Sequence, residues 1–364
     1  MHGLRRRPPV DFSCGSDARP TSVAIACQGG GSHAAFTAGV LKVLLTSGEA
    51  ARYWVRGLSG TSGGAISAAL AWYGLLSGGS ERSIHLLDGL WRDSSAILPF
   101  ERALNGYDVW ASRLPVTLKT SPYTPPLSTI VEQLRILAQL QRVSPTVGPR
   151  REFVDLRALL SKYLDLDSVQ AHRGAPRFLV GAVDVLSGEF KTFDSENGEI
   201  SVETLLASAA LPALFRAVPL AGRLYWDGLF SQNPPIREFV STPQQADEKP
   251  DEIWIVQINP QTRDAEPRAP EDIEDRRNEL AGNLSLNQEV HFIETINALL
   301  ARDALEDRER YKPVNVKWIA IDPTMVRSRL DVASKSNRDP AFIQDLIAHG
   351  EHQARAFLKR RQPT

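Results

Sequence analysis

The chain has 364 residues, of which 42% are hydrophobic and 23% are charged, a balance typical of a globular protein with a sizeable buried core. The formal net charge of -1 excludes the strongly basic character of most nucleic-acid-binding proteins, so we expect no nucleic-acid partner. Two cysteines are too few for a disulfide scaffold. No apolar run approaches the roughly 18 residues of a transmembrane helix, so we expect no transmembrane segment.

The first 20 residues differ from the rest of the chain. They contain the basic cluster Arg5-Arg6-Arg7 but no apolar segment behind it, whereas a secretory signal needs both. We therefore interpret residues 1–20 as a flexible N-terminal tail and expect a cytoplasmic protein.

The first elements of the chain predict a parallel sheet. The apolar run at 22–27 predicts a strand that ends at a glycine turn, and apolar residues at helical spacing follow at 34–48. A second strand is predicted at 53–58 and a second helix at 65–76. Strand, helix, strand and helix in succession indicate a βαβ unit, whose strands are parallel.

A proline-rich stretch at about 98–149 interrupts this pattern. It contains one predicted helix, at 128–141, and we interpret it as an insertion or lid of the same domain. Its helix either contacts a lipid surface or packs on the core. Residues 177–194 then alternate apolar and polar side chains around Ser187-Gly188, which predicts a β-hairpin.

The second half of the chain supplies further elements of the same kinds. The expected elements are, in chain order, a helix at 204–215, a turn within 223–236, a strand at 253–260, a helix at 284–300, a strand at 314–322 and a helix at 342–360. The highly charged segment 261–279 is expected to be exposed or mobile. We find no internal repeat.

The sequence Gly60-Thr61-Ser62-Gly63-Gly64 fits the pattern G-x-S-x-G between a predicted strand and a predicted helix. In that context the pattern places a serine on a strained turn as a catalytic nucleophile. Gly60 and Gly64 are the small residues of this nucleophile elbow, because side chains there would clash where strand and helix approach. The N–H group of Gly63 is a natural donor to a developing oxyanion. The alternative is an ordinary glycine turn.

A second glycine turn, Gly29-Gly30-Gly31, ends the neighbouring strand and precedes a helix, so its N–H groups can point at an anion. With Ala34 the segment also fits the dinucleotide-binding pattern G-x-G-x-x-G/A. That pattern requires an acidic residue at the end of the second strand, but residues 58–62 contain none. We therefore favour an oxyanion loop that faces the nucleophile across adjacent parallel strands.

A nucleophilic serine needs a base, and no histidine lies directly after a predicted strand. The histidines occur at positions 2, 33, 85, 172, 291, 349 and 352. Asp227 is better placed, in the apolar segment YWDGL at 225–229, although Asp-Gly alone is most often an ordinary turn. We expect Trp226 and Leu229 to limit hydration of this carboxyl group and so raise its pKa.

Four segments in the same order resemble the motifs of patatin-like phospholipases. They are GGGSHAAFTAGVL (29–41), GLSGTSGGAISAAL (57–70), ASAALPALFRAV (207–218) and WDGLFSQNPP (226–235). The resemblance implies a three-layer α/β/α sandwich with a mostly parallel central sheet. We expect a catalytic domain at 21–325 and a helical extension at 326–364 that packs on the same domain.

The same resemblance implies a Ser-Asp dyad without a histidine. Ser62 would be the nucleophile, Asp227 the general base, and Gly29, Gly30 and Gly31 the oxyanion loop. No metal or other cofactor is expected, because the dyad needs none and no metal-ligand spacing is visible in the sequence.

Two positions depart from the family pattern. The glycine block usually continues with a basic residue and a glycine, and here His33 and Ala34 stand in their places. His33 is a candidate contact with the substrate; the alternative is a solvent-facing residue in the first turn of the helix.

The expected function is hydrolysis of fatty-acyl esters of phospholipids or related lipids through an acyl-serine intermediate. The expected partners are a lipid ester substrate and, transiently, a membrane surface, contacted through the stretch at 98–149. Two alternatives stay open at this point. One is a serine hydrolase or acyltransferase that acts on another ester or thioester, and the other is a non-catalytic module that binds lipid or protein.

Overall fold

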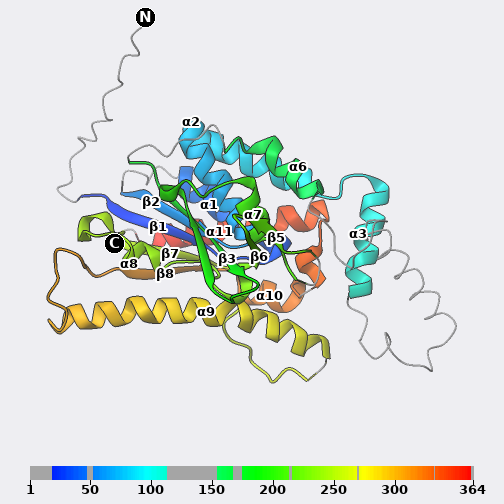
Figure 1. Cartoon of the computed structure of the whole chain (residues 1–364). Coiled ribbons are helices and arrows are strands. Elements are labelled where there is room, and N and C mark those ends of the chain that lie inside the picture. Colours follow the sequence, from blue (N-terminus) through cyan, green and yellow to red (C-terminus); the bar gives the residue numbers. More distant parts are fainter. Residues whose placement is uncertain are drawn as a thin grey trace, which may run out of the picture.

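A mostly parallel sheet forms the centre of the protein (Figure 1). The structure is a computed structural model, described over residues 19–46, 52–112, 154–166, 174–212, 215–268, 270–331 and 333–361. Five strands run parallel in the order β3-β2-β1-β7-β8. Their bounds are β1 Thr21–Cys27, β2 Tyr53–Gly60, β3 Arg177–Asp184, β7 Glu252–Gln257 and β8 Asn315–Ala320.

Three antiparallel strands complete the sheet at the β3 side. Strand β4 (Phe190–Asp194) pairs with β3 as the predicted hairpin, whose turn contains Gly188 at a φ of 74°. Strand β6 (Arg223–Asp227) also pairs with β3, and β5 (Val218–Leu220) pairs with β6. The sheet is therefore mixed but mostly parallel, as the sequence predicts.

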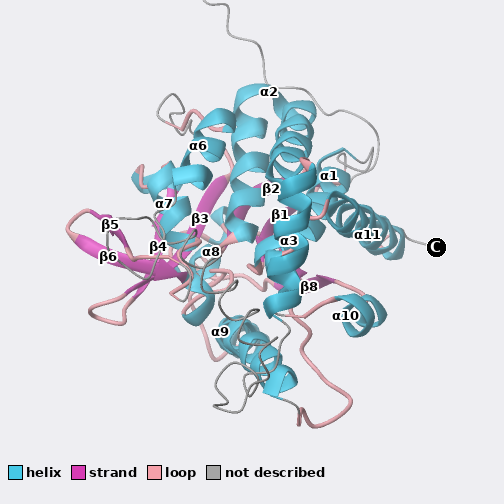
Figure 2. Ribbon diagram, turned by 90° about the vertical axis from the view of Figure 1, so that its right-hand side faces the viewer, coloured by secondary structure: helices cyan, strands magenta, loops and turns pink. Residues whose placement is uncertain are grey.

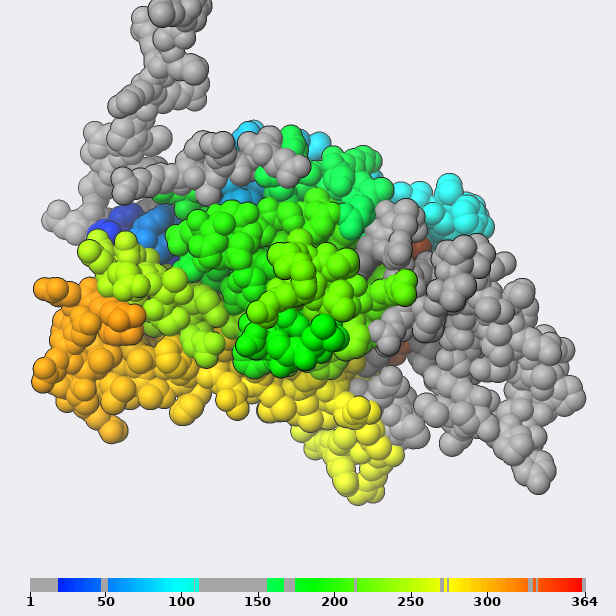
Figure 3. Space-filling view, in the orientation of Figure 1, coloured from blue at the N-terminus to red at the C-terminus, as the bar shows by residue number. Residues whose placement is uncertain are grey.

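Helices cover both faces of the sheet (Figures 1 and 2). On one face lie α1 (Ala35–Thr46), α2 (Gly63–Ser94), α6 (Val154–Tyr163), α7 (Val202–Ser208) and α11 (Pro340–Arg360). On the other face lie the short α8 (Glu238–Ser241) and the long α9 (Pro270–Ala301). In the space-filling view, α9 runs in yellow and orange below the green strand segments (Figure 3).

Side-chain alternation along the strands separates two hydrophobic cores. In β1, Val23 and Ile25 face the core under α1 and α2, whereas Ala24 and Ala26 face the core under α9. Successive side chains of a strand point to opposite faces, so a strand that is apolar on both faces must be covered on both. This arrangement confirms the three-layer architecture.

Helices α1 and α11 cross in close contact through two glycines. A Cβ atom at Gly350 would lie 2.0 Å from the carbonyl oxygen of Phe36, and one at Gly39 would lie 2.0 Å from that of Ile347. No side chain fits at such distances. The two backbones can touch because both positions are glycines.

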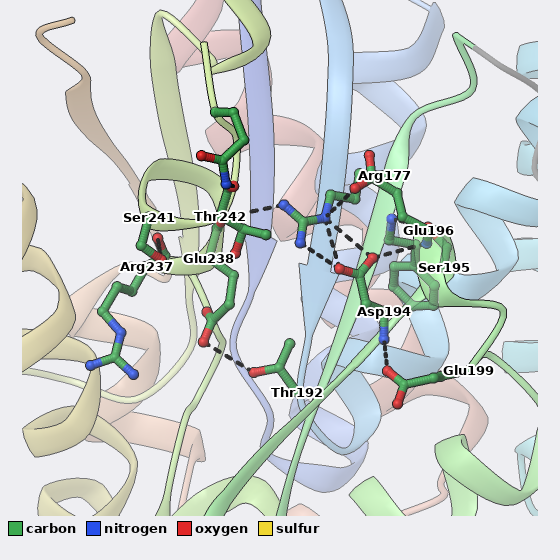
Figure 4. Close-up of polar contacts among 12 residues, drawn as sticks. Arg177, Thr192, Asp194, Ser195, Glu196, Glu199, Arg237, Glu238, Ser241 and Thr242 are labelled. Atoms are coloured by element: carbon green, nitrogen blue, oxygen red, sulfur yellow. Dashed lines mark hydrogen bonds and ion pairs between the residues drawn. The ribbon is translucent and has the colours of Figure 1, made fainter. Parts of the chain in front are cut away.

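A buried ion pair fixes the start of β3 (Figure 4). The Arg177 guanidinium binds the Asp194 carboxylate on β4 and donates to the carbonyl oxygen of Glu238 in α8 at 3.1 Å. Both charged side chains are buried, so each charge depends on its partner. The pair joins the hairpin to the helix on the α9 face.

Three expected elements differ from the structure. The helix predicted at 204–215 ends at Ser208, and α2 continues to Ser94 across a kink at Gly79, whose φ of 77° is not helical. The segment 261–279 differs only in part: most of its described residues are exposed, as expected, but α9 begins at Pro270 and the buried Glu279 binds two arginines. Ion pairing allows that charged sequence to pack.

Helix α3 (Pro99–Ser112) is a further element, and no helix was predicted there. It lies at one side of the molecule, away from the sheet (Figure 1). The helix predicted at 128–141 and most of the tail predicted at 1–20 lie outside the described residues. Within the described ranges, no helix is both long enough and apolar enough to cross a lipid bilayer.

Substituting Gly350 by alanine tests the α1–α11 contact. We expect a loss of about 1–3 kcal/mol in the free energy of unfolding, because the added methyl group overlaps the Phe36 carbonyl and the backbones must separate. Chemical denaturation monitored by circular dichroism measures this loss.

The matched control is Gly106→Ala in α3, where a Cβ atom meets nothing within 4 Å and helix propensity favours alanine by about 1 kcal/mol. Equal stability of Gly350→Ala and the wild type would contradict the contact.

Candidate active site

Ser62 occupies a strained turn between β2 and α2. Its backbone angles are φ 55° and ψ -131°, a region that residues with a side chain rarely adopt. A Cβ atom at Gly60 would lie 2.5 Å from the Cα of Ala65, and one at Gly64 would lie 2.4 Å from the carbonyl oxygen of Cys27. The strand and the helix are therefore as close as a nucleophile elbow requires.

The glycine block packs directly against this turn. Strands β1 and β2 are adjacent and parallel, so the turns that follow them open at the same edge of the sheet. A Cβ atom at Gly29 would lie 2.9 Å from the Cβ of Ser62, and one at Gly63 would lie 2.7 Å from the carbonyl oxygen of Gly31. Both glycine turns consequently line one small space around the serine.

The N–H groups of the two glycine turns are not equivalent. The N–H of Gly29 donates to Oδ1 of Asn233 at 2.6 Å, so it is already occupied by a protein acceptor. Those of Gly30, Gly31 and Gly63 have no acceptor among the residues that the structure describes. The geometry thus leaves three of the four predicted oxyanion donors.

Strand pairing explains how Asp227 reaches a serine 165 positions earlier in the chain. Strand β4 pairs with β3 from Leu179 to Val183 and occupies one edge of β3. The other edge pairs first with β2, up to Val180, and then with β6, whose Asp227 lies opposite Ala182. Strands β2 and β6 therefore approach each other end to end along the same edge.

Small residues and one hydrogen bond hold the Asp227 loop against the serine turn. The hydroxyl of Thr61 donates to the carbonyl oxygen of Gln232 at 2.5 Å. A Cβ atom at Gly228 would lie 2.6 Å from the carbonyl oxygen of Gly181 and 3.0 Å from Cγ2 of Thr61. The Asp-Gly pair is therefore required by packing and is not an ordinary exposed turn.

The carboxyl group of Asp227 is isolated from water. The residue is 0% exposed and Ser62 is 7% exposed. Oδ1 accepts the N–H of Leu229 at 2.8 Å, within the short helix η4 (Gly228–Phe230). Burial raises the pKa of Asp227 to about 7, while the nearby Ser62 side chain, the N–H of Leu229 and the charge of Lys335 act in the opposite direction.

Ser208 supports the elbow and was not singled out by the sequence. Its hydroxyl donates to the carbonyl oxygen of Gly181 at 2.6 Å and accepts the N–H of Ser62 at 2.9 Å. It therefore links α7, β3 and Ser62. The only sequence signal is that Ser208 lies in the ASAAL segment, which is one of the four motifs.

His33 is buried and does not face solvent, which contradicts one of the two interpretations left open by the sequence. It is 3% exposed, and Nε2 lies 2.7 Å from the hydroxyl of Ser334 in the short helix η6 (Ala333–Ser336). Burial is the main cause that lowers its pKa, to about 3, so the ring is neutral. It lines a cavity of about 20 Å³ together with Asn259 and Lys335.

The other described histidines take no part in this site. His349 accepts the N–H of Asp322 at 3.0 Å, and His291 is exposed on α9. Among the described residues, no three His, Cys, Asp or Glu side chains are grouped so that they could hold a metal ion.

Comparison with models of protein families identifies the family of this chain. A family model described as patatin-like phospholipase matches residues 25–240, which include Ser62 and Asp227. A comparison with curated protein sequences finds no match.

Similar solved structures include proteins from two bacteria. VipD from Legionella pneumophila is 15% identical, with a TM-score of 0.43 over 94% of this chain and 67% of that one. ExoU in complex with SpcU, from the type III secretion system of Pseudomonas aeruginosa, is similar in two structures. One is 14% identical, with a TM-score of 0.31 over 93% of this chain and 53% of that one; the other is 16% identical, with a TM-score of 0.30 over 94% and 62%. The chain thus spans about half to two thirds of the length of these proteins.

Proposed function

Because the chain belongs to the patatin-like phospholipase family, we propose that it hydrolyses fatty-acyl ester bonds of phospholipids or related lipids with a Ser62-Asp227 dyad. One observation carries this proposal. The carboxyl group of Asp227 is fully buried beside a serine on a strained turn, and its pKa is raised to about 7. A carboxylate with that pKa is about as basic as a histidine.

In the acylation step, Oγ of Ser62 attacks the ester carbonyl carbon while its proton moves to the carboxylate of Asp227. Oδ1 of Asp227 is held by the N–H of Leu229, and Oδ2 has no hydrogen-bond partner among the described residues, so Oδ2 is the acceptor that we assign. Collapse of the tetrahedral intermediate breaks the bond to the alcohol, which leaves with the proton from Asp227.

In the deacylation step, water attacks the acyl-serine and gives a proton to Asp227. Collapse of the second intermediate releases the fatty acid, and the proton returns to Oγ of Ser62. During both steps the negative oxygen is stabilised by the N–H groups of Gly30, Gly31 and Gly63. The proposed contact between His33 and the substrate stays a prediction.

We also propose that the protein is cytoplasmic and contacts a membrane surface transiently. Helix α3 is anchored beside η6, because Asn105 binds Asn337 at 2.8 Å. It carries Phe100, which is 61% exposed, and the half-exposed Leu104 and Trp110. An apolar surface of this kind next to a lipid-hydrolysing site favours contact with lipid.

Replacing Ser62 by alanine or Asp227 by asparagine tests the dyad. We expect each variant to lose at least about 10³-fold in kcat, since each removes a reacting group. Release of fatty acid from phospholipid vesicles measures the loss, and a fluorophosphonate probe should label the wild type but not Ser62→Ala. The matched control is His291→Ala, which should keep wild-type turnover. Turnover by Asp227→Asn at the wild-type rate would refute the dyad, and no labelling of folded wild-type protein would favour a non-catalytic module.

The raised pKa of Asp227 predicts a specific pH dependence. Below its pKa the carboxyl group is neutral and cannot accept the serine proton, so kcat/KM should rise as the pH increases through about 7. The matched control is Glu289→Gln, because burial also raises the pKa of Glu289 to about 7 and this carboxylate binds Gln232 in the same loop. An acid limb that stays near pH 7 in Glu289→Gln is expected. Its disappearance in that variant would assign the titration to Glu289.

Exposed side chains of α3 are expected to contribute to membrane contact. The double variant Phe100→Ser, Leu104→Ser should bind phosphatidylcholine vesicles roughly tenfold more weakly, since about 1.5–3 kcal/mol is available for fully burying one such side chain. Co-sedimentation measures the binding. Leu186→Ser, at a 79% exposed position in the β3–β4 turn, is the control and should bind as the wild type does. Unchanged binding of the double variant would exclude α3 as the contact.

A further inference from the structure

A lysine outside the family-matched residues 25–240 lies against the glycine block. Lys335 belongs to η6, and its carbonyl oxygen would be 2.3 Å from a Cβ atom at Gly31, where φ is 57°. The preceding residue, Ser334, binds the ring of His33. The backbone of η6 is therefore in direct contact with the proposed oxyanion loop.

The ammonium group of Lys335 is connected to that loop through one amide. Its Nζ donates to Oδ1 of Asn259 and to Oδ1 of Asn278, both at 3.2 Å. Nδ2 of Asn259 in turn donates to the carbonyl oxygen of Gly29 at 3.3 Å. A continuous chain of hydrogen bonds thus runs from the lysine to the first glycine of the block.

The surroundings of this ammonium group are mainly acidic, yet it lacks a close ion-pair partner. Glu279 and Asp275 face it from α9, and Asp331 and His33 line the same cavity. No carboxylate of the described residues lies within 4 Å of Nζ, and Asp227 is among the groups whose charge acts on it.

The acidic groups near Lys335 differ in whether another positively charged side chain binds them. Glu279 already binds Arg263 at 2.8 Å and Arg276 at 3.0 Å. Asp227 binds no arginine or lysine within 4 Å among the described residues. The positive charge of Lys335 is consequently available to the active site.

We propose that Lys335 is a positioning residue of the active site that acts on the glycine block through Asn259. This inference rests on the proposed Ser62-Asp227 chemistry. Through Asn259 the lysine holds the carbonyl of Gly29 and so orients the N–H groups that follow. Through its charge it stabilises negative charge at Asp227 and at the oxyanion.

The ionisation of Lys335 gives this role a measurable signature. Burial lowers the pKa of Lys335 to about 8, so the group is charged at neutral pH and loses its charge just above it. The charge also lowers the pKa of Asp227. Removing the positive charge of Lys335 should raise the pKa of Asp227. A residue that stays charged at higher pH should extend the pH range in which the enzyme is active.

The test compares Lys335→Gln, Lys335→Arg and, as a matched control, Lys359→Gln at the exposed end of α11. In Lys335→Gln we expect kcat to fall about 10- to 100-fold and the acid limb of kcat/KM to move to higher pH. In Lys335→Arg we expect activity to return and the decline above pH about 8 to move to higher pH, because arginine stays charged. Lys359→Gln should match the wild type.

A structural role alone would lower activity without moving either limb of the pH profile, and that result would overturn the proposal. A wild-type pH profile and kcat in folded Lys335→Gln would also overturn it.

Carbon-13 NMR of the Asp227 carboxyl group measures the same effect of the Lys335 charge without turnover. If the wild type hydrolyses no ester while Lys335→Gln still raises the pKa of Asp227, the proposed function fails and the coupling stands. If turnover depends on Ser62 but the pKa of Asp227 is unchanged, only the role of Lys335 fails.

Discussion

The loop that contains Thr61 contacts the loop that contains Gln232. The hydroxyl of Thr61 donates to the carbonyl oxygen of Gln232 at 2.5 Å. Each loop follows a strand that pairs with the same edge of β3, one parallel and one antiparallel. The approach is possible only because Gly181 and Gly228 carry no side chain. The position of Asp227 relative to Ser62 therefore depends on strand pairing and on the absence of two side chains.

A second property follows from that approach, because loops in such close contact leave no room for water around the carboxyl group. A buried carboxylate without a full set of donors loses much of its preference for the charged form. In this protein the Ser62 hydroxyl, the Leu229 N–H and the distant charge of Lys335 restore part of it. The raised pKa and the burial of Asp227 are thus two results of one packing arrangement.

Local sequence and the family resemblance single out those parts of the candidate site that are made by consecutive residues. The elbow at 60–64, the glycine block and Asp227 each have a recognisable pattern, and alternation along the strands predicted the covered sheet. The supporting contacts could not be predicted in this way. His33 and Ser334 are separated by 301 positions, and nothing in the first turn of a helix indicates such a partner.

A charged segment gives another example. Residues 261–279 were expected to be exposed or mobile, and most of the described ones are exposed, but Arg263 and Arg276 neutralise Glu279 and so allow this residue to be buried. Similarly, Asn259 can donate to the carbonyl oxygen of Gly29 only because β7 ends beside β1. Patterns in a single sequence indicate the local structure that a residue favours. The positions of these residues depend instead on contacts with residues far away in the chain.

The pairing of β1 with β7 has a consequence for how this protein can be divided. The family-matched segment ends at residue 240, before β7 begins at Glu252. A fragment cut there would keep Ser62 and Asp227 but would expose the hydrogen-bonding edge of β1 and the face of α1 that α11 covers. An open edge of an apolar strand is a template for association with other chains. A fragment that ends at residue 240 would therefore contain Ser62 and Asp227 but would not remain a monomer in solution.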